Sequence, residues 1–142
     1  MTGDVTLRAA TGDDAERVVR FWHDAGASMT ANDSVERVRL AIDHAAALLA
    51  IAESRGALVG TLLGTYDGWR GNMYRLVVRP DRRREGIGRQ LVRRIEQFFA
   101  ERGATRITVL IEVDRPWAVD FWTAVGYPRD HHIVRHVGTI TS

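Results

Sequence analysis

Apolar and polar residues follow two different periods along the chain, and their order predicts a mixed α/β protein. Apolar runs and period-two alternation, bounded by turn residues, are typical of strands. Such runs cover residues 5–9, 47–51, 57–66, 73–79, 106–113 and 133–137. Helical spacing predicts two helices between the first two strands, a long helix from Gly86 and a short helix over 118–124. The predicted order is therefore β-α-α-β-β-β-α-β-α-β.

The long helix carries the clearest pattern. Its apolar residues fall on one face and its arginines and glutamines on the other. The apolar face consists of Ile87, Leu91, Val92, Ile95, Phe98 and Phe99. Gly103 follows the last turn, where glycine ends many helices. With strands 73–79 and 106–113 on either side, the pattern predicts a right-handed βαβ unit with a parallel strand pair.

Turn and cap residues separate the other elements. Glycine-containing turns at 53–56 and 67–71 divide the middle strands. Pro80 ends the strand before it, because proline has no N–H for the ladder. Asp33 with Glu36 three residues later predicts the cap of the second helix.

The composition indicates a single soluble domain over residues 1–142, expected in the cytoplasm. Hydrophobic residues make up 45% and charged residues 27% of the sequence. No apolar run approaches the ~18 residues of a membrane span, and the chain does not begin with a signal-peptide pattern. Cysteine is absent, which excludes disulfides, thiolate nucleophiles and zinc–thiolate sites. All 20 basic residues other than histidine are arginine, so lysine-based phosphate loops and Schiff bases are excluded as well.

The stretch RRREGIGRQL (82–91) joins a predicted strand to the long helix. The start of a helix offers unpaired backbone N–H groups and the positive end of the helix dipole, which together favour an anion. Gly86 and Gly88 let the oxygens of an anion approach the main chain, and Arg83, Arg84 and Arg89 add positive charge. On these residues alone two interpretations stay open: a site for one compact anion such as a diphosphate, or a tight turn with solvated arginines.

Two motifs favour the anion site over the tight turn. RREGIG (83–88) resembles the acetyl-CoA signature Arg/Gln-x-x-Gly-x-Gly/Ala of the GCN5-related N-acetyltransferase (GNAT) superfamily. AVDFWTAVGY (118–127) resembles a second element of that family, Ala-x-x-Phe-Tyr-x-x-x-Gly-Phe. The resemblance covers nearly the whole chain, and residues 64–79 are similar to a branch of small bacterial members with poorly defined acceptors. It implies the GNAT fold, a mixed α/β (α+β-like) architecture with a twisted, mostly antiparallel sheet, a central parallel pair and helices on both faces.

The resemblance also implies a function and a set of site residues. The implied reaction moves the acetyl group of acetyl-CoA, a co-substrate, to a primary amine by direct attack. The acceptor stays open between a protein N-terminus, a lysine side chain and a small metabolite. Main-chain groups of the preceding strand would pair with the pantetheine arm, and amides of the loop would hold the pyrophosphate. The implied cofactor-binding residues are Leu76, Val77, Val78, Arg83, Arg84, Glu85, Gly86, Ile87, Gly88, Arg89 and Trp122.

The reaction needs a base for the ammonium and benefits from an acid for the departing thiolate. Glu112, on the predicted strand 106–113, is the candidate base, with an exposed or ion-paired structural carboxylate as the alternative. The family usually supplies the acid as the tyrosine of Phe-Tyr, where this chain has Trp122, whose indole is not a usable acid. Tyr127 is the candidate replacement. Alternatively, the thiolate leaves unprotonated, since its reference pKa is about 8.5.

Other partners are predicted to be absent. The histidines near the carboxyl end, His131, His132 and His136, lie in or beside the predicted strand 133–137 without ligand spacing, so no metal site is expected. The first rival function is an acetyl-CoA-binding module with lost or weak catalysis, motivated by Trp122. The second is nucleic-acid binding through the arginine loop, which the net charge of only +2 argues against. We therefore expect no nucleic acid and no membrane partner, and the resemblance is compatible with a homodimer.

Overall fold

The computed structural model describes residues 4–112 and 114–141, and the chain divides into two compact units. The first unit is Met1–Leu110 and the second is Ile111–Ser142. The prediction of one domain over 1–142 stays a prediction.

The first unit holds most of the regular structure. Its strands are β1 (Val5–Ala9), β2 (Ala47–Ser54), β3 (Ala57–Tyr66), β4 (Gly71–Val78) and β5 (Ile107–Val109). Its α-helices are α1 (Ala15–Asp24), α2 (Val35–Asp43) and α3 (Ile87–Glu101). Three short 3-10 helices join them, namely η1 (Gly12–Asp14), η2 (Ala31–Asp33) and η3 (Pro80–Arg82). The order of the strands and α-helices in this unit is the predicted one.

The strands form one sheet in the order β1-β2-β3-β4-β5. The first four pair antiparallel, and β4 pairs parallel with β5. The predicted parallel pair on either side of the long helix is thus present, and β5 is the last strand of the sheet. Arg55 and Gly56, both at positive φ, make the two-residue turn between β2 and β3.

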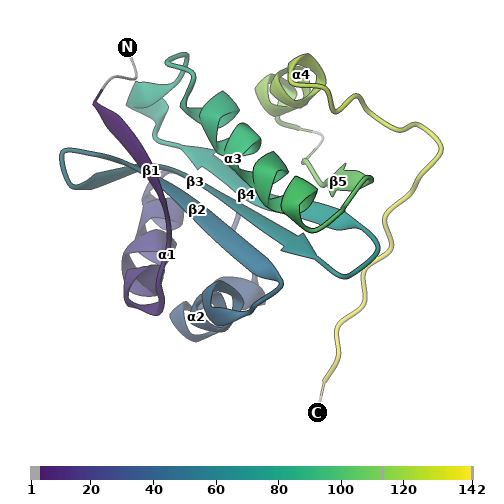
Figure 1. Cartoon of the computed structure of the whole chain (residues 1–142), viewed down its shortest axis with the longest axis horizontal. Helices are drawn as coiled ribbons and strands as arrows, with labels where there is room; N and C mark the ends of the chain where they lie inside the picture. Colours follow the sequence, from purple (N-terminus) through teal and green to yellow (C-terminus); the bar gives the residue numbers. More distant parts are fainter. Residues whose placement is uncertain (1–3, 113, 142) are drawn as a thin grey trace. The chain divides into compact units, whose positions relative to one another are not determined.

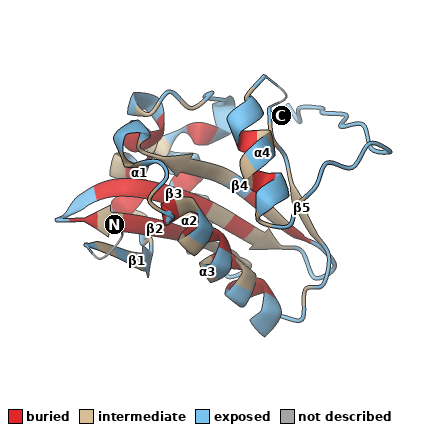
Figure 2. Cartoon of the chain, turned by 90° about the horizontal axis from the view of Figure 1, so that it is seen from above, coloured by how far each residue is buried: buried red, intermediate tan, exposed pale blue. Residues whose placement is uncertain are grey.

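Helices cover both faces of the sheet (Figure 1). On one face, α1 and α2 pack over β2 and β3 around a buried cluster that includes Val18, Trp22, Leu49 and Ile51. On the other face lies α3, whose predicted apolar residues are all buried. Figure 2 shows the buried residues concentrated along the central strands.

Glycines on the sheet set how closely α3 packs. A Cβ built on Gly64 would lie 2.5 Å from Ile95 Cγ2, and one built on Gly71 would lie 2.9 Å from Phe99 Cε1. Such distances are too short for real carbon contacts, so only glycine allows this helix position without movement. Gly103 at φ +75° follows the end of α3, as predicted.

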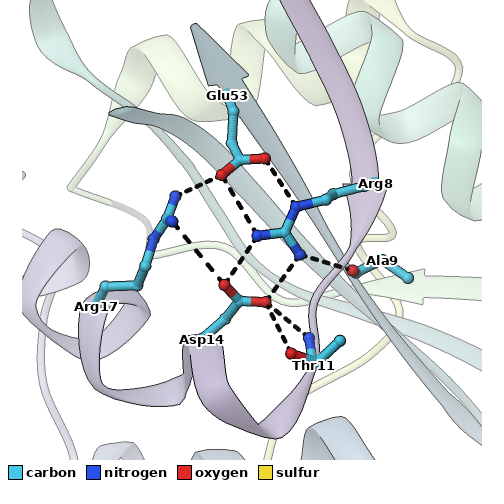
Figure 3. Close-up of polar contacts among 6 residues, drawn as sticks. All are labelled: Arg8, Ala9, Thr11, Asp14, Arg17 and Glu53. Atoms are coloured by element: carbon cyan, nitrogen blue, oxygen red, sulfur yellow. Dashed lines mark hydrogen bonds and ion pairs between the residues drawn. The ribbon is translucent and has the colours of Figure 1, made fainter. Parts of the chain in front are cut away.

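An ion-pair network ties the start of α1 to the first two strands (Figure 3). Arg8 of β1 binds Asp14 through both terminal nitrogens, each bond 2.9 Å long. Glu53 of β2 accepts from Arg8 Nε at 2.8 Å and from Arg17 Nη2 at 2.7 Å. Asp14 also accepts from the Thr11 amide at 2.8 Å. The network therefore joins η1 and α1 to β1 and β2.

Two strand predictions are wrong. Residues 133–137 form no strand: Ile133, Val134 and Val137 are 69–79% exposed, and the segment has no partner in the sheet of the described residues. A strand needs a neighbour for its backbone groups, so β-branched composition alone does not create one. The strand predicted at 106–113 is limited to β5, and its last residue, Val113, lies outside the described residues.

The predicted cap of α2 is also wrong. Ser34 Oγ accepts from the Arg37 amide at 3.2 Å and caps this helix, instead of Asp33. Asp33 ends η2, where its carboxylate accepts from the Thr30 amide at 2.7 Å. Asp33 is thereby turned toward the protein interior and is buried.

The second unit contains α4 (Pro116–Ala124), which begins two residues before the predicted helix. Gly126 at φ +106° follows its end. Along the described ranges of both units, no helix is long and apolar enough to cross a membrane.

Candidate active site

The end of β4 presents the strand segment predicted to bind the pantetheine arm. Val77 pairs with Thr61 of β3 and Val78 pairs with Gly60. Leu76, Val77 and Val78 are all half-buried. This end of β4 is followed directly by the loop that precedes α3.

The loop from β4 to α3 folds into a concave backbone. Arg84 adopts φ +66° and Gly86 adopts φ +84°, ψ +8°, both in the left-handed region. Gly86 is the residue before the first turn of α3, and no side chain caps this helix start. The amides of Ile87, Gly88 and Arg89 belong to the first turn, where N–H groups have no intrahelical acceptor. The glycine loop therefore precedes the positive end of a 15-residue helix whose first amides lack intrahelical acceptors, an arrangement that favours an anion.

An ion pair inside the loop fixes its shape. Arg82 Nε donates to Glu85 Oε2 at 2.8 Å, and Arg82 Nη2 donates to Glu85 Oε1 at 3.0 Å. The same Arg82 nitrogen reaches Asp4 Oδ1, 3.1 Å away beside β1. The hydrogen bonds from Arg82 hold the pKa of Glu85 below its usual value. Glu85 is thus paired with Arg82, while Arg83, Arg84 and Arg89 add formal positive charge within and beside the same loop.

Glu112, the candidate base, lies in the second unit and not on a strand. Its side chain is 49% exposed, and Glu112 Oε2 lies 3.2 Å from Arg115 Nε. Glu112 thus forms an ion pair with Arg115, as the alternative of a structural carboxylate predicted for this residue. The Arg115 partner was not predicted, although their spacing of three residues offered a signal.

Trp122 and Tyr127 lie together in the second unit. Their rings meet edge to face with centroids 5.5 Å apart, and the Tyr127 amide donates to the Trp122 carbonyl at 2.8 Å. Trp122 is buried and Tyr127 is half-buried. The resemblance placed both residues in one motif, and the structure brings them into contact.

The histidines near the carboxyl end lie in a segment without regular structure. Over residues 4–112 and 114–141, no group of three His, Cys, Asp or Glu side chains is placed to hold a metal ion.

An ion pair between Arg75 of β4 and Asp33 was not predicted from the sequence. Arg75 adopts φ +60° within the strand and forms an ion pair with the buried Asp33. No local pattern marks Arg75, since the pair joins residues 42 positions apart.

Comparisons with known proteins identify the family of the chain. A family model described as "Acetyltransferase (GNAT) family" matches residues 14–127. An "Acetyltransferase" from Yersinia pestis (strain Pestoides F) is 29% identical over 121 residues, which cover 85% of this chain and 86% of the relative.

Solved structures share the fold. A structure of the acetyltransferase AAC(6')-Iy with the bisubstrate analogue CoA-S-monomethyl-acetylneamine superposes with a TM-score of 0.80 at 11% identity, covering 96% of this chain and 99% of that one. A crystal structure of a transcriptional regulator from Bacillus halodurans C-125 gives a TM-score of 0.77 at 25% identity, covering 94% and 99%. Because the family model spans most of the sequence, the chain belongs to the acetyltransferase (GNAT) family, and it is an acyl-CoA-dependent N-acetyltransferase with acetyl-CoA as its co-substrate.

Proposed function

We propose that the chain moves the acetyl group of acetyl-CoA to a primary amine by direct attack, with the coenzyme held between β4 and α3. The observation that carries this proposal is the pair of left-handed residues, Arg84 and Gly86, at the uncapped start of α3. Left-handed residues of this kind can turn successive amides toward one anion, and we propose that a pyrophosphate supplies the matching acceptors. The arginines around this point add charge that a diphosphate would neutralise.

Each part of the coenzyme has a proposed place. The pantetheine arm lies along Leu76, Val77 and Val78 and pairs with their main-chain groups as an added strand. The pyrophosphate is held by amides between Arg83 and Arg89. Trp122 is proposed to touch the coenzyme as well.

Direct attack is consistent with the side chains available. The chain has no cysteine to carry an acyl group. Glu112 is proposed to accept the proton of the incoming ammonium, which requires its carboxylate to exchange the bond with Arg115 for the amine. Tyr127 is proposed to protonate the thiolate. An unassisted thiolate departure is the alternative, since a thiol of pKa about 8.5 is an adequate leaving group.

The acceptor is proposed as an amine without further assignment. Aminoglycosides are candidates because AAC(6')-Iy was solved with an acetylneamine analogue. A panel of test amines therefore contains aminoglycosides, together with peptides that have a free N-terminus or a lysine. Free-thiol release against this panel identifies the acceptor, and an enzyme that binds acetyl-CoA but acetylates no amine would support the binding-module alternative.

Binding is tested by thermal shift with acetyl-CoA, CoA and an oligonucleotide in parallel. We expect a rise with both coenzymes and none with the oligonucleotide. A response to the oligonucleotide alone, steeply reduced by salt, would favour nucleic-acid binding instead. Light scattering tests the proposed homodimer in the same samples.

Gly86→Glu is expected to abolish coenzyme binding, because it adds a carboxylate at the phosphate position and strains a left-handed residue. Gly56→Glu is the matched control: Gly56 lies in the β2–β3 turn at φ +81°, and a Cβ added to it would meet no atom within 4 Å. Isothermal titration should show loss of acetyl-CoA affinity only in the first variant. Equal affinities in both would contradict the proposed site.

Glu112→Gln is expected to keep coenzyme binding and to slow turnover chiefly below the pKa of the acceptor amine, where the base is needed. The measurement is kcat/KM for the amine as a function of pH. Asp114→Asn, two residues along, is the control for a general change in charge. Wild-type rates in Glu112→Gln across the pH range would remove Glu112 from the mechanism.

A further inference from the structure

Strand β4 contains a bulge where the segment proposed to bind pantetheine begins. Thr61 pairs with Val77 and Leu63 pairs with Tyr74, so one β3 residue lies opposite two residues of β4, Arg75 and Leu76. Such an extra residue interrupts the ladder and changes the direction of the strand. The bulge therefore determines where the main chain of Leu76 begins its path along the proposed coenzyme.

Arg75, the residue at the bend, has an unusual backbone conformation. Arg75 has φ +60°, a left-handed conformation that is strained for a residue with a side chain and that glycine adopts freely. Strain of this kind persists where surrounding contacts compensate for it, and it is common at functional sites. The contacts of Arg75 therefore show what maintains the bulge.

The Arg75 side chain is held by the segment between α1 and α2. Arg75 Nε donates to Asp33 Oδ1 at 3.1 Å, and Arg75 Nη2 contacts Asp33 Oδ2, which makes the pair bidentate. Asp33 is fixed in turn by bonds from the Thr30 amide and hydroxyl, 2.7 and 2.9 Å long. The exposed fractions of the two side chains are 20% for Arg75 and 9% for Asp33, so the pair is shielded from water.

The Arg75 main chain is held from the other side. Thr61 Oγ1 donates to the Arg75 carbonyl at 3.0 Å, and Trp22 Nε1 donates to Thr61 Oγ1 at 2.8 Å. The Arg75 guanidinium carbon also lies 5.2 Å from the centroid of the Trp22 ring. Four elements, α1, η2, β3 and β4, thus converge on one backbone bend.

We propose that Arg75 and Asp33 are positioning residues for acetyl-CoA: their ion pair holds the β4 bulge and so places the Leu76–Val78 main chain for the pantetheine arm. This inference rests on the proposed coenzyme site. Through Asp33, η2 would influence the binding of the pantetheine arm, although η2 is distant in sequence from that site. The pyrophosphate loop lies beyond the bulge and is braced separately by Arg82 and Glu85.

Two ligands separate positioning from general stability. Acetyl-CoA contains both the pyrophosphate and the pantetheine arm, whereas ADP contains the adenosine and pyrophosphate parts without the pantetheine arm. Asp33→Asn should raise the Kd of acetyl-CoA about 10-fold, a typical order for a misplaced binding group, and leave the Kd of ADP unchanged. Isothermal titration for acetyl-CoA and competition for ADP provide the two values, with circular dichroism confirming the fold.

Arg75→Gly provides a second, independent variant. Glycine adopts the left-handed conformation without the ion pair, so the bulge should survive and the Kd of acetyl-CoA should rise less than in Asp33→Asn. In the Arg75→Gly background, Asp33→Asn should cause no further rise, because the two residues act through one contact. Asp14→Asn removes a comparable ion pair at η1 and should lower stability without changing either Kd.

The outcomes are distinct. A parallel loss of acetyl-CoA and ADP affinity in Asp33→Asn, or an unchanged affinity for acetyl-CoA, overturns the positioning role alone. Additive effects of Asp33→Asn and Arg75→Gly overturn it as well. A wild-type protein that binds acetyl-CoA normally while Gly86→Glu has no effect overturns the proposed site, and with it this inference.

Discussion

Asp14 provides a quantitative test of the ion-pair network at the start of α1. Its carboxylate is 8% exposed and accepts two hydrogen bonds from Arg8. These bonds, with a further bond from the Thr11 amide, lower the pKa of Asp14 from 3.8 to about 2. Asp14→Asn removes the charge and keeps the size of the side chain.

The expected magnitude follows from proton linkage. One pH unit of difference between the folded and unfolded pKa corresponds to 1.36 kcal/mol, so a pKa of about 2 against 3.8 gives the folded state roughly 2.5 kcal/mol at neutral pH. Since the folded pKa is the lower one, this stability is present above pH 3.8 and is lost as the pH falls through about 2. Asp14→Asn should therefore reduce the free energy of unfolding by about 2 kcal/mol at pH 7.

Urea unfolding followed by circular dichroism measures this difference at pH 7, 4 and 2. The difference in free energy of unfolding between wild type and Asp14→Asn should have its full value at pH 7 and nearly disappear at pH 2. Asp13→Asn, at the exposed neighbouring position, is the matched control and should stay within about 0.5 kcal/mol of wild type. A gap below 0.5 kcal/mol at pH 7, or a gap that persists unchanged at pH 2, would refute the reasoning.

Two further predictions concern α3 and the loop before it. Gly64→Ala should lower the free energy of unfolding by about 1–3 kcal/mol, because the new methyl overlaps Ile95. Ile95→Ala is destabilising by itself, but the double variant should lose less than the sum of the two single losses, because the smaller side chain leaves room for the methyl. Urea unfolding measures all three variants, and strictly additive losses would contradict the contact. Arg82→Gln should raise the Kd of acetyl-CoA several-fold by releasing Glu85, whose carboxylate would then repel phosphate. Titration calorimetry checks this second effect, and its absence would mean that the loop keeps its shape without Arg82.

Sequence periodicity predicted the parts of the fold that local patterns determine. The strand expected at 57–66 is β3 with the same bounds, and the apolar face of α3 is buried in full. Both elements contain many core residues at regular spacing, so tertiary packing agrees with local preference. The glycine signature likewise predicted the loop, because a left-handed residue at Gly86 is what glycine permits at lowest cost.

Features that depend on distant partners were not predictable in this way. Residues 133–137 have strand-forming composition but no neighbouring strand among the described residues, and composition does not reveal a missing neighbour. Asp33 has the sequence context of a helix cap, yet its carboxylate pairs with Arg75 from another element. The roles of Glu112 and Tyr127 stay predictions, because they depend on where a bound amine and thioester lie.

The glycines beneath α3 have a consequence for how this protein can vary among its relatives. Since the missing side chain at position 64 is filled by the side chain at position 95, the two positions should change together across homologous sequences. A relative with alanine at the first should carry a smaller residue than isoleucine at the second. Where only position 64 has gained a side chain, the helix must sit farther from the strands, and its amino-terminal amides would shift with it relative to β4.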